Sequence, residues 1–302
     1  MRLGKKIKRS AVYLLVRFCF FFINLIPRKL ALKFGTEIGK LTWHFSKKDR
    51  DQIEKNLSWV YKDRLTPEQR EQISHEFFIF SGKNLIDVIR FKKHFKTEIF
   101  PLVTIEGLEH LHEAFKRGKG MIGITGHIGN FELMAAYLCT LEYDFAVIAR
   151  EMYDKRIDEI LVSNRTSMGV TNISTTASPI KIIKWLKKNN GLGVLIDTDS
   201  HRVKSEFIEW FGKPAYTPVG QTILGLKTGA AFLPLACVRI DDNHYHIIIR
   251  PIIDVPLTGD ISIDTIEITT ACVRELESII NNYKSQWIWL HDRWHTKQEK
   301  SS

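Results

Sequence analysis

Alternation of strand-like and helical segments constrains the fold of this 302-residue chain more than any other feature of its sequence. Short runs rich in β-branched residues recur from about residue 102, and helical stretches such as 154–168 and 179–189 lie between most of them. The runs are VTIEG, MIGIT, FAVIA, LGVLID, FLPLACVRI and YHIIIRPII. This alternation predicts an α/β fold with a mostly parallel central sheet flanked by helices. The last two runs, joined across DDNH, predict a C-terminal antiparallel hairpin.

The first hundred residues lack such runs and are predicted to be helical. Thr66 has the position of an N-cap, Pro67 suits the first helical position, and Gln69 completes a capping box. Apolar residues then recur at helical spacing. We therefore expect a helical region at 37–100 that packs on an α/β domain at 101–295, followed by a frayed tail at 296–302.

Positive charge is concentrated at the N-terminus. Residues 1–36 contain nine lysines and arginines and no acidic residue, whereas the rest of the chain is nearly neutral. Residues 11–27 are mostly apolar but are interrupted by Arg17 and Asn24, and a simple bilayer span needs roughly 20 apolar residues. A basic and apolar helix is typical of a segment that lies in an anionic membrane interface, so we expect residues 1–36 to be a helical membrane anchor. The alternative is a buried first helix.

Several classes of site are excluded by residue spacing. The four cysteines are far apart and no CxxC occurs, which argues against a disulfide framework or a cysteine zinc site. GKGMIG matches GxGxxG formally, but its glycines precede a strand and do not predict a dinucleotide site. His291 and His295 have helical ligand spacing without a nearby acidic ligand. We expect neither a metal nor a cofactor, and the clustering of the charge argues against nucleic acid.

The sequence GHIGNFE, residues 126–132, is the main candidate for a catalytic site. His127 follows the strand MIGIT, and ligands bind at the carboxyl ends of strands in open α/β sheets. Asn130 is placed to cap the next helix, with Glu132 in its first turn. His127 and Glu132 meet only if the chain bends between them, and the two glycines of the motif permit such a bend. The pair is then a general base with an orienting carboxylate; the alternative is a loop histidine beside a solvated acid.

A histidine, four residues, then Asp or Glu is the signature of the glycerolipid-type acyltransferase superfamily, and nearly the whole chain resembles the lipid A biosynthesis acyltransferases. GHIGNFE is similar to their catalytic block, and the basic apolar N-terminus resembles their membrane anchor. Further blocks follow in the family's order: Asn56-Leu57, VIAR ending at Arg150 with Glu151 in place of proline, LIDTD with Asp197 and Asp199, FIEWFGKPAYTPVG, and QWIWLHDRW with Trp287, Trp289, His291 and Arg293.

The resemblance implies transfer of a fatty acyl chain from an acyl carrier protein thioester to a hydroxyl of a lipid A precursor, with no metal or cofactor. His127 is then the general base, and Glu132 fixes the tautomer of its imidazole. Arg150 is expected to hold an anionic group, either an acceptor phosphate or the phosphopantetheine of the carrier. Its alternative is a surface salt bridge. Asp197 and Asp199 are expected to shape the site or hold Arg150, or to be structural only.

The expected protein is a monomer at the cytoplasmic face of the bacterial inner membrane. Its expected partners are the acyl carrier protein, an anionic lipid acceptor and the membrane surface. An acidic carrier needs a basic dock, and Lys181, Lys184 and Lys188 share one face of the helix SPIKIIKWLKKNN; a solvated helix face is the alternative. Other functions remain open: an acyltransferase for another glycolipid or a lysophospholipid, a thioesterase, or a lipid-binding protein without activity.

Overall fold

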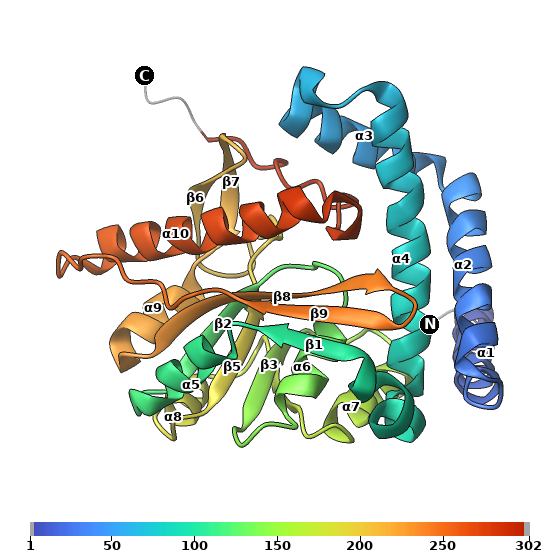
Figure 1. Cartoon of the computed structure of the whole chain (residues 1–302), viewed down its shortest axis with the longest axis horizontal. Coiled ribbons are helices and arrows are strands. Elements are labelled where there is room, and N and C mark those ends of the chain that lie inside the picture. Colours follow the sequence, from blue (N-terminus) through green and yellow to red (C-terminus); the bar gives the residue numbers. More distant parts are fainter. Residues whose placement is uncertain (1–2, 299–302) are drawn as a thin grey trace.

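The computed structural model describes residues 3–298, with side chains from residue 8 onward. Its centre is a seven-stranded sheet in the order β1-β9-β8-β2-β5-β3-β4 (Figure 1). Neighbouring strands are parallel except for β8 and β9, which form an antiparallel hairpin. The predicted mostly parallel sheet and its hairpin are confirmed. The strands are β1 (Val103–Glu106), β2 (Met121–Thr125), β3 (Phe145–Ala149), β4 (Thr171–Ser174), β5 (Gly191–Leu195), β8 (Ala231–Asp241) and β9 (His244–Ile249).

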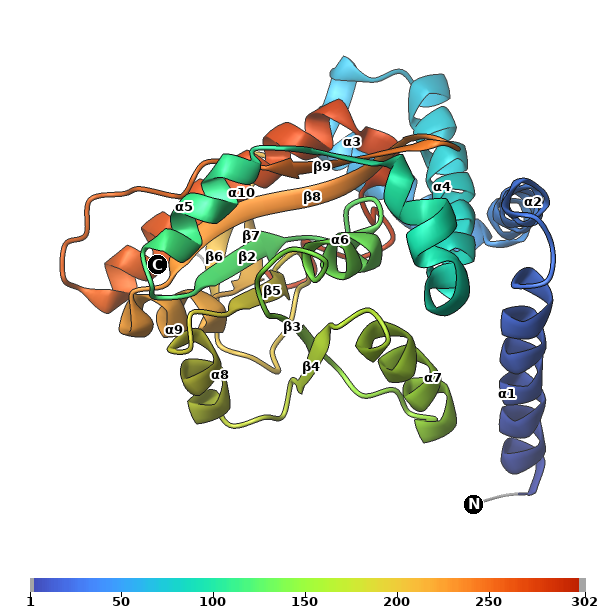
Figure 2. The same ribbon diagram turned by 60° about the horizontal axis from the view of Figure 1, so that its bottom comes forward.

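Helices cover both faces of this sheet and create two apolar cores (Figure 2). Along β8, Phe232 and Ala236 belong to the core that contains α8 and α10, whereas Leu233 and Leu235 belong to the core that contains α5 and α6. This division follows from the two-residue period of a strand, which sends successive side chains to opposite faces. The helices are α5 (Leu108–Lys116), α6 (Phe131–Leu138), α7 (Lys155–Thr166), α8 (Pro179–Leu186), α9 (Gly220–Thr228) and α10 (Ile261–Asn282).

A separate two-stranded antiparallel sheet lies between β5 and α9 in the chain. It consists of β6 (Ser205–Trp210) and β7 (Lys213–Pro218), and the pattern of β-branched runs did not predict it. The indole of Trp210 stacks on that of Trp287 with ring centroids 5.7 Å apart. The small sheet therefore packs against the C-terminal segment that follows α10.

Helices make up the N-terminal region, as predicted. They are α1 (Leu3–Ile23), α2 (Arg28–Phe45), α3 (Lys47–Tyr61) and α4 (Pro67–His94), with short 3-10 helices at Lys62–Arg64, Phe100–Leu102 and Lys284–Gln286 and a π-helix at Phe95–Ile99. The capping box at the start of α4 is present, because the backbone N–H of Gln69 donates to Thr66 Oγ1 at 3.3 Å and the Gln69 side chain accepts from the Thr66 N–H at 2.8 Å. The expected border between residues 36 and 37 falls inside α2.

The helix α2 packs on α4 at backbone contact distance. A Cβ added at Gly39 would lie 2.5 Å from the carbonyl oxygen of Phe78, and Gly82 on α4 faces the backbone of Gly35 just as closely. On the side away from α4, both α1 and α2 expose apolar side chains: Val12, Leu14, Leu15, Phe18, Phe21 and Phe22 on α1, and Leu30, Phe34, Ile38, Leu41 and Phe45 on α2. Across residues 3–298, the helices are all too short or too polar to cross a bilayer.

Replacement of Gly39 by Ala should lower the free energy of unfolding by about 1 to 3 kcal/mol, because the added methyl has backbone as its neighbour and the two helices must separate. Gly220→Ala is the matched control, since a Cβ there meets no atom within 4 Å and alanine favours a helix by up to about 1 kcal/mol. Urea unfolding measures both variants. Equal or greater stability of Gly39→Ala would contradict the close α2–α4 contact.

Candidate active site

The loop between β2 and α6 carries His127 and is held by the backbone of two other segments. The N–H of Asn130 donates to the carbonyl of Cys237 on β8 at 2.7 Å, and the N–H of Gly129 donates to the carbonyl of Gln286 at 2.7 Å. Gly129 has a φ of +56° and its Cα faces the Cys237 carbonyl, so no side chain fits there. The predicted bend is therefore present, and Asn130 caps α6 through a bond from the N–H of Leu133 at 3.0 Å.

His127 is oriented by Asp197, which follows β5. Nδ1 of the imidazole lies 2.8 Å from Oδ1 of Asp197, and the backbone N–H of His127 donates to Oδ2 at 2.6 Å. The indole N–H of Trp287 donates to the same Oδ2 at 2.9 Å. Because β2 and β5 are adjacent parallel strands, their carboxyl ends meet at one edge of the sheet and bring the two residues together.

Mutual attraction outweighs the cost of burying this charged pair. Burial raises the pKa of Asp197, but the charge and hydrogen bonds of His127, together with the bond from Trp287, bring it down to about 2. Burial lowers the pKa of His127, but Asp197 and then the charge of Glu132 raise it above its ordinary value. An ionised carboxylate only accepts hydrogen bonds, so Nδ1 carries a proton and Nε2 of the neutral ring is free to act as a base.

Glu132 does not make the expected contact with the imidazole. Its two carboxylate oxygens accept from Arg165 near the end of α7, with Nε of Arg165 2.8 Å from Oε2. The reason lies in the local structure: α6 begins at Phe131 and points Glu132 toward α7, while the loop before it turns His127 toward β5. The orienting role thus belongs to Asp197. Glu132 acts on His127 only through its charge, and its own catalytic role stays a prediction.

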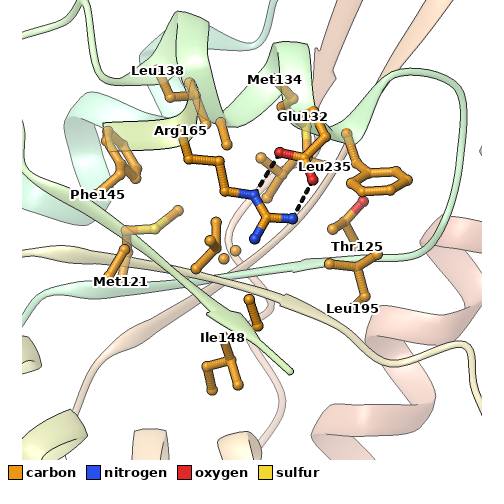
Figure 3. A pocket seen from close by; sticks show the side chains of 17 residues that line it. Met121, Thr125, Glu132, Met134, Leu138, Phe145, Ile148, Arg165, Leu195 and Leu235 are labelled. Atoms are coloured by element: carbon orange, nitrogen blue, oxygen red, sulfur yellow. Dashed lines mark hydrogen bonds and ion pairs between the residues drawn. The ribbon is translucent and has the colours of Figure 1, made fainter. Parts of the chain in front are cut away.

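An apolar cavity lies beside the Glu132–Arg165 pair, between α6 and the strands β2, β3 and β5 (Figure 3). Its empty space, including the open mouth, is about 640 Å³. Met121 and Phe145, which begin β2 and β3, line one part of it, and Thr125 and Ala149, which end the same strands, line another. The cavity therefore runs along the strands toward the sheet edge that carries His127.

A second hollow of about 340 Å³ contains His127 itself. One wall comes from α4, and another comes from residues that follow α10: Phe77, Phe80, Ser81 and Asn84 on the first, and Ser285, Gln286 and Ile288 on the second. Phe131 lines both this hollow and the apolar cavity, and its ring centroid lies 5.2 Å from that of His127. The side chain of Phe131 is thus shared by the hollow around His127 and the apolar cavity.

The sequence model of the bacterial lipid A biosynthesis acyltransferase family matches residues 5–296. The chain belongs to this family. It is 25% identical to the lipid A biosynthesis lauroyltransferase of Escherichia coli K12 over 91% of this chain and 88% of the relative, and 21% identical to the lipid A biosynthesis acyltransferase of Haemophilus influenzae over 93% and 87%. It is also 25% identical to a phosphatidylinositol mannoside acyltransferase of Mycobacterium tuberculosis over 63% of this chain, and the match spans only 59% of that relative.

The other predicted site residues of this family member lie in different environments. Arg150 is exposed at the end of β3 and makes no ion pair or hydrogen bond with the rest of residues 3–298, so the surface salt bridge is not seen. Asp199 accepts from the backbone and hydroxyl of Thr296, each at 2.8 Å, and so holds the start of the expected tail. Asp199 therefore has a structural contact and no contact with Arg150. Residues 299–302 of the tail lie outside the described part of the chain.

Sequence reasoning assigned no role to two residues that the fold places at the site. Arg165 is one, and no motif around it signals its pairing with Glu132. His291 is the other: its ring centroid lies 5.2 Å from that of His127, and its buried Nδ1 has no partner among the described residues. Burial and then the charge of His127 lower the pKa of His291 below its ordinary value. Its place in the Trp-x-Trp-x-His-x-Arg block was the available signal.

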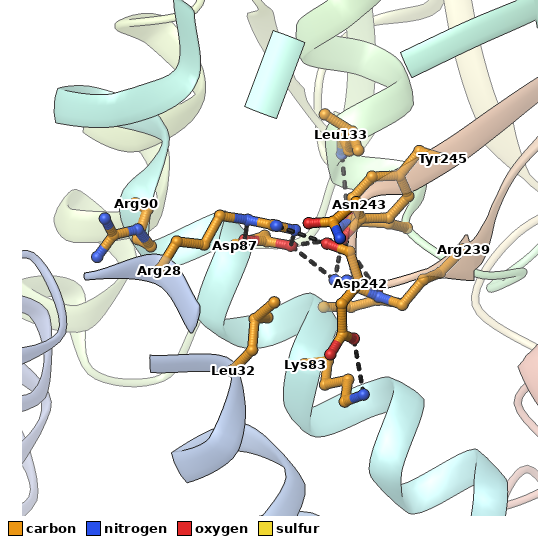
Figure 4. Close-up of polar contacts among 12 residues, drawn as sticks. Arg28, Leu32, Lys83, Asp87, Arg90, Leu133, Arg239, Asp242, Asn243 and Tyr245 are labelled. Atoms are coloured by element: carbon orange, nitrogen blue, oxygen red, sulfur yellow. Dashed lines mark hydrogen bonds and ion pairs between the residues drawn. The ribbon is translucent and has the colours of Figure 1, made fainter. Parts of the chain in front are cut away.

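A buried polar network holds α4, one wall of the His127 hollow, against the sheet (Figure 4). Asp87 on α4 pairs with Arg28 at the start of α2 and with Arg239 on β8, each at 2.7 Å, and accepts from the hydroxyl of Tyr245 at 2.8 Å. Burial raises the pKa of Asp87, but the two arginines lower it below its ordinary value. The side chain of Gln286 then bonds both backbone groups of Arg239 at 2.8 Å, which joins the network to the loop of His127.

Replacement of Asp197 by Asn should lower the pKa of His127, because the amide removes the negative charge while burial continues to disfavour the imidazolium. NMR titration of the His127 ring, assigned with a His127→Gln sample, measures the change. Asp199→Asn is the control, because its side chain contacts Thr296 and not the imidazole. An unchanged pKa of His127 in the Asp197→Asn protein would contradict the pairing.

The effect of Asp197→Asn on the free energy of unfolding should depend on pH, and its sign follows from the pKa shifts of His127 and Asp197. The raised pKa of His127 stabilises the fold fully below the ordinary value of about 6.5, and this contribution is lost as the pH rises through the folded value. The lowered pKa of Asp197 stabilises the fold above about 3.9, and this contribution is lost as the pH falls toward 2. The difference in unfolding free energy between wild type and Asp197→Asn should therefore be largest between about pH 4 and 6.5.

Proposed function

We propose that this family member is a membrane-bound O-acyltransferase that moves a fatty acyl chain from an acyl carrier protein thioester to a hydroxyl of a lipid A precursor. The observation that carries this proposal is the position of the His127 imidazole, held by Asp197 beside an apolar cavity. The cavity suits a fatty acyl chain, because its lining is almost entirely apolar. In this proposal the thioester carbon lies near Phe131, which lines both the cavity and the hollow around the imidazole.

In the proposed reaction, Nε2 of His127 takes the proton from the acceptor hydroxyl as its oxygen attacks the thioester carbon. The tetrahedral intermediate collapses with cleavage of the C–S bond, and His127 returns the proton to the departing thiolate. The products are the acylated lipid and the free thiol of the carrier. Asp197 keeps Nδ1 protonated and stabilises the imidazolium that forms between the two proton transfers.

The remaining site residues have proposed roles that follow from their surroundings. Glu132 and Arg165 neutralise each other beside the cavity, and the charge of Glu132 favours protonation of His127. Arg150 is available to bind an anionic group of either substrate, since its exposed guanidinium has no partner among the described residues. Lys181, Lys184 and Lys188 are exposed on or just after α8 and form the proposed dock for the acidic carrier protein.

A second acceptor class is also supported. The mycobacterial relatives named phosphatidylinositol mannoside acyltransferases act on a different glycolipid, so another glycolipid is the alternative to lipid A for this chain. For either acceptor, the exposed apolar sides of α1 and α2 and the basic residues 1–36 support attachment to an anionic membrane. We place the protein at the cytoplasmic face of the bacterial inner membrane, where acyl carrier protein is available.

Replacement of His127 by Ala should lower the transferase rate by roughly 10²- to 10⁴-fold, because the acceptor loses its general base. The measurement incubates purified protein with radiolabelled acyl carrier protein thioester and a lipid A precursor or another glycolipid in vesicles. Labelled lipid in the wild-type reaction supports transfer and identifies the acceptor, whereas labelled free fatty acid alone supports a thioesterase. The control variant is His246→Ala, which should retain activity because the imidazole of His246 on β9 pairs with Glu106 on β1, outside both hollows.

Replacement of Gly193 by Val should shift the preference toward shorter acyl chains. Gly193 lines the apolar cavity, and a Cβ there meets only ordinary contacts, the nearest at 3.6 Å from Val147, so the added side chain occupies the cavity without crowding the sheet. Loss of room for about two methylenes lowers kcat/KM for the preferred chain by roughly tenfold. Thioesters of graded length measure the shift against Gly220→Val, a position outside both hollows. An unaltered chain-length profile would remove the acyl chain from this cavity.

A further inference from the structure

The loop between β3 and α7 exposes large side chains next to the apolar cavity. It comprises residues 150–154 and directly follows Ala149, which lines the cavity. Tyr153 is 84% exposed and Met152 is 44% exposed. Most of the surface of a tyrosine ring and of a methionine side chain is apolar, so their exposure side by side at the edge of a cavity suggests a contact surface.

This loop is fastened to α1. The guanidinium carbon of Arg9 lies 3.8 Å from the ring centroid of Tyr153. On the adjoining helix α7, the guanidinium of Arg156 lies 4.7 Å from the ring of Tyr13 and donates to the hydroxyl of Ser10 at 3.4 Å. Figure 2 shows α1 standing away from the sheet, on the side where α7 lies. Contacts between cations and aromatic rings therefore join α1 to the loop and to α7.

The side of α1 that faces away from these contacts is apolar. Leu14, Leu15, Phe18 and Phe21 are each 61–63% exposed, while Ser10 and Tyr13 contact α7. A surface helix usually exposes polar side chains, whereas most of the exposed positions on this part of α1 are apolar. With the exposed side chains of the loop, the surface combines apolar groups and tethered cations.

The positive charge of the N-terminal residues indicates the chemistry of the partner that covers this surface. Residues 1–36 carry nine basic and no acidic side chains, and only Arg28 among the nine pairs with the buried Asp87, so the remaining positive charge favours an occupant that is anionic as well as apolar. The loop has two acidic residues of its own. The carboxylate of Asp154 is paired with Arg156 at 2.8 Å, and Glu151 has the basic residues Arg150 and Lys155 near it in the sequence. A bilayer with anionic headgroups offers negative charge above hydrocarbon, which matches cations beside apolar side chains.

We propose that loop 150–154 and α1 form one surface that docks on an anionic bilayer, with Met152 and Tyr153 inserted at the interface. This goes beyond attachment by an N-terminal anchor, because it assigns a second contact from within the α/β domain. It also sets the orientation of the protein, because the part of the apolar cavity lined by Ala149, at the end of β3, then faces the lipid. Arg150, between the cavity wall and the inserted side chains, then lies at the level of the headgroups.

The test compares the variant Met152→Ser/Tyr153→Ser with the control Ile180→Ser/Leu257→Ser. The control removes two exposed apolar side chains outside the proposed surface, Ile180 at 61% and Leu257 at 62% exposure. The segment that contains Leu257, between β9 and α10, lies at the end of the molecule away from α1 in both views (Figures 1 and 2). Flotation of full-length protein with phosphatidylglycerol-containing vesicles, at limiting lipid, should show partitioning about tenfold weaker for the first variant and within twofold of wild type for the control. Equal partitioning of all three proteins overturns the proposal.

A second measurement reports insertion in the folded protein directly. Met152→Cys labelled with a polarity-sensitive fluorophore should show a blue-shifted emission with phosphatidylglycerol vesicles and a smaller shift with purely zwitterionic ones. Wild type labelled in parallel gives the background from its four cysteines. The absence of a blue shift in vesicle-bound protein overturns the proposal. It is also overturned if Met152→Ser/Tyr153→Ser binds acyl carrier protein more weakly but binds vesicles as the wild type does. Neither readout requires acyl transfer, so failure of the proposed reaction is scored separately.

Discussion

The buried carboxylate of Asp197 is the group on which the candidate active site depends. It accepts from the backbone N–H of His127, faces the imidazole Nδ1, and accepts from the indole of Trp287. A carboxylate without solvent is tolerated only when hydrogen bonds and an opposite charge compensate it. The contacts that orient the His127 imidazole are therefore also the ones that allow Asp197 to be buried.

Close backbone approach makes these contacts possible. A Cβ at Gly126 would lie 2.7 Å from Oδ2 of Asp197, so glycine lets the loop reach the carboxylate. From the other side, the buried Asn56 on α3 donates to the carbonyls of Trp289 and His291, each at 2.7 Å, and so fixes the C-terminal segment against the site. The expected block at Asn56 thus has a clear physical role, as a clamp on the chain that presents Trp287 and His291.

The N-terminal helices and the site share α4. One side of α4 packs on α2 through glycine contacts and carries Asp87, which joins Arg28 to Arg239. Another side supplies Phe77, Phe80, Ser81 and Asn84 to the hollow around His127. Only α4 therefore lies between α2 and the hollow around His127, and Tyr153 in loop 150–154 contacts Arg9 of α1 next to the apolar cavity.

Local patterns in the sequence determined the elements and the position of His127 at the end of a strand. The alternating runs predicted the parallel sheet, Thr66 to Gln69 predicted the start of α4, and GHIGNFE predicted a bend, a helix cap and a histidine at a strand end. These features depend on residues near one another in the chain, so periodicity and capping rules reach them. The helical character of the basic N-terminus was predicted for the same reason, while its attachment to a membrane stays a prediction.

Only the tertiary structure decided which carboxylate meets which cation. The sequence pairs His127 with Glu132, five residues away, but the structure pairs it with Asp197, seventy residues away, and gives Glu132 to Arg165. Asp199, two residues beyond Asp197, turns instead to Thr296. The physical reason is that strand order and helix direction decide which side chains meet. The strand β5 lies beside β2, and α6 directs Glu132 away from the loop of His127. Neither fact can be read from the spacing of residues along the chain.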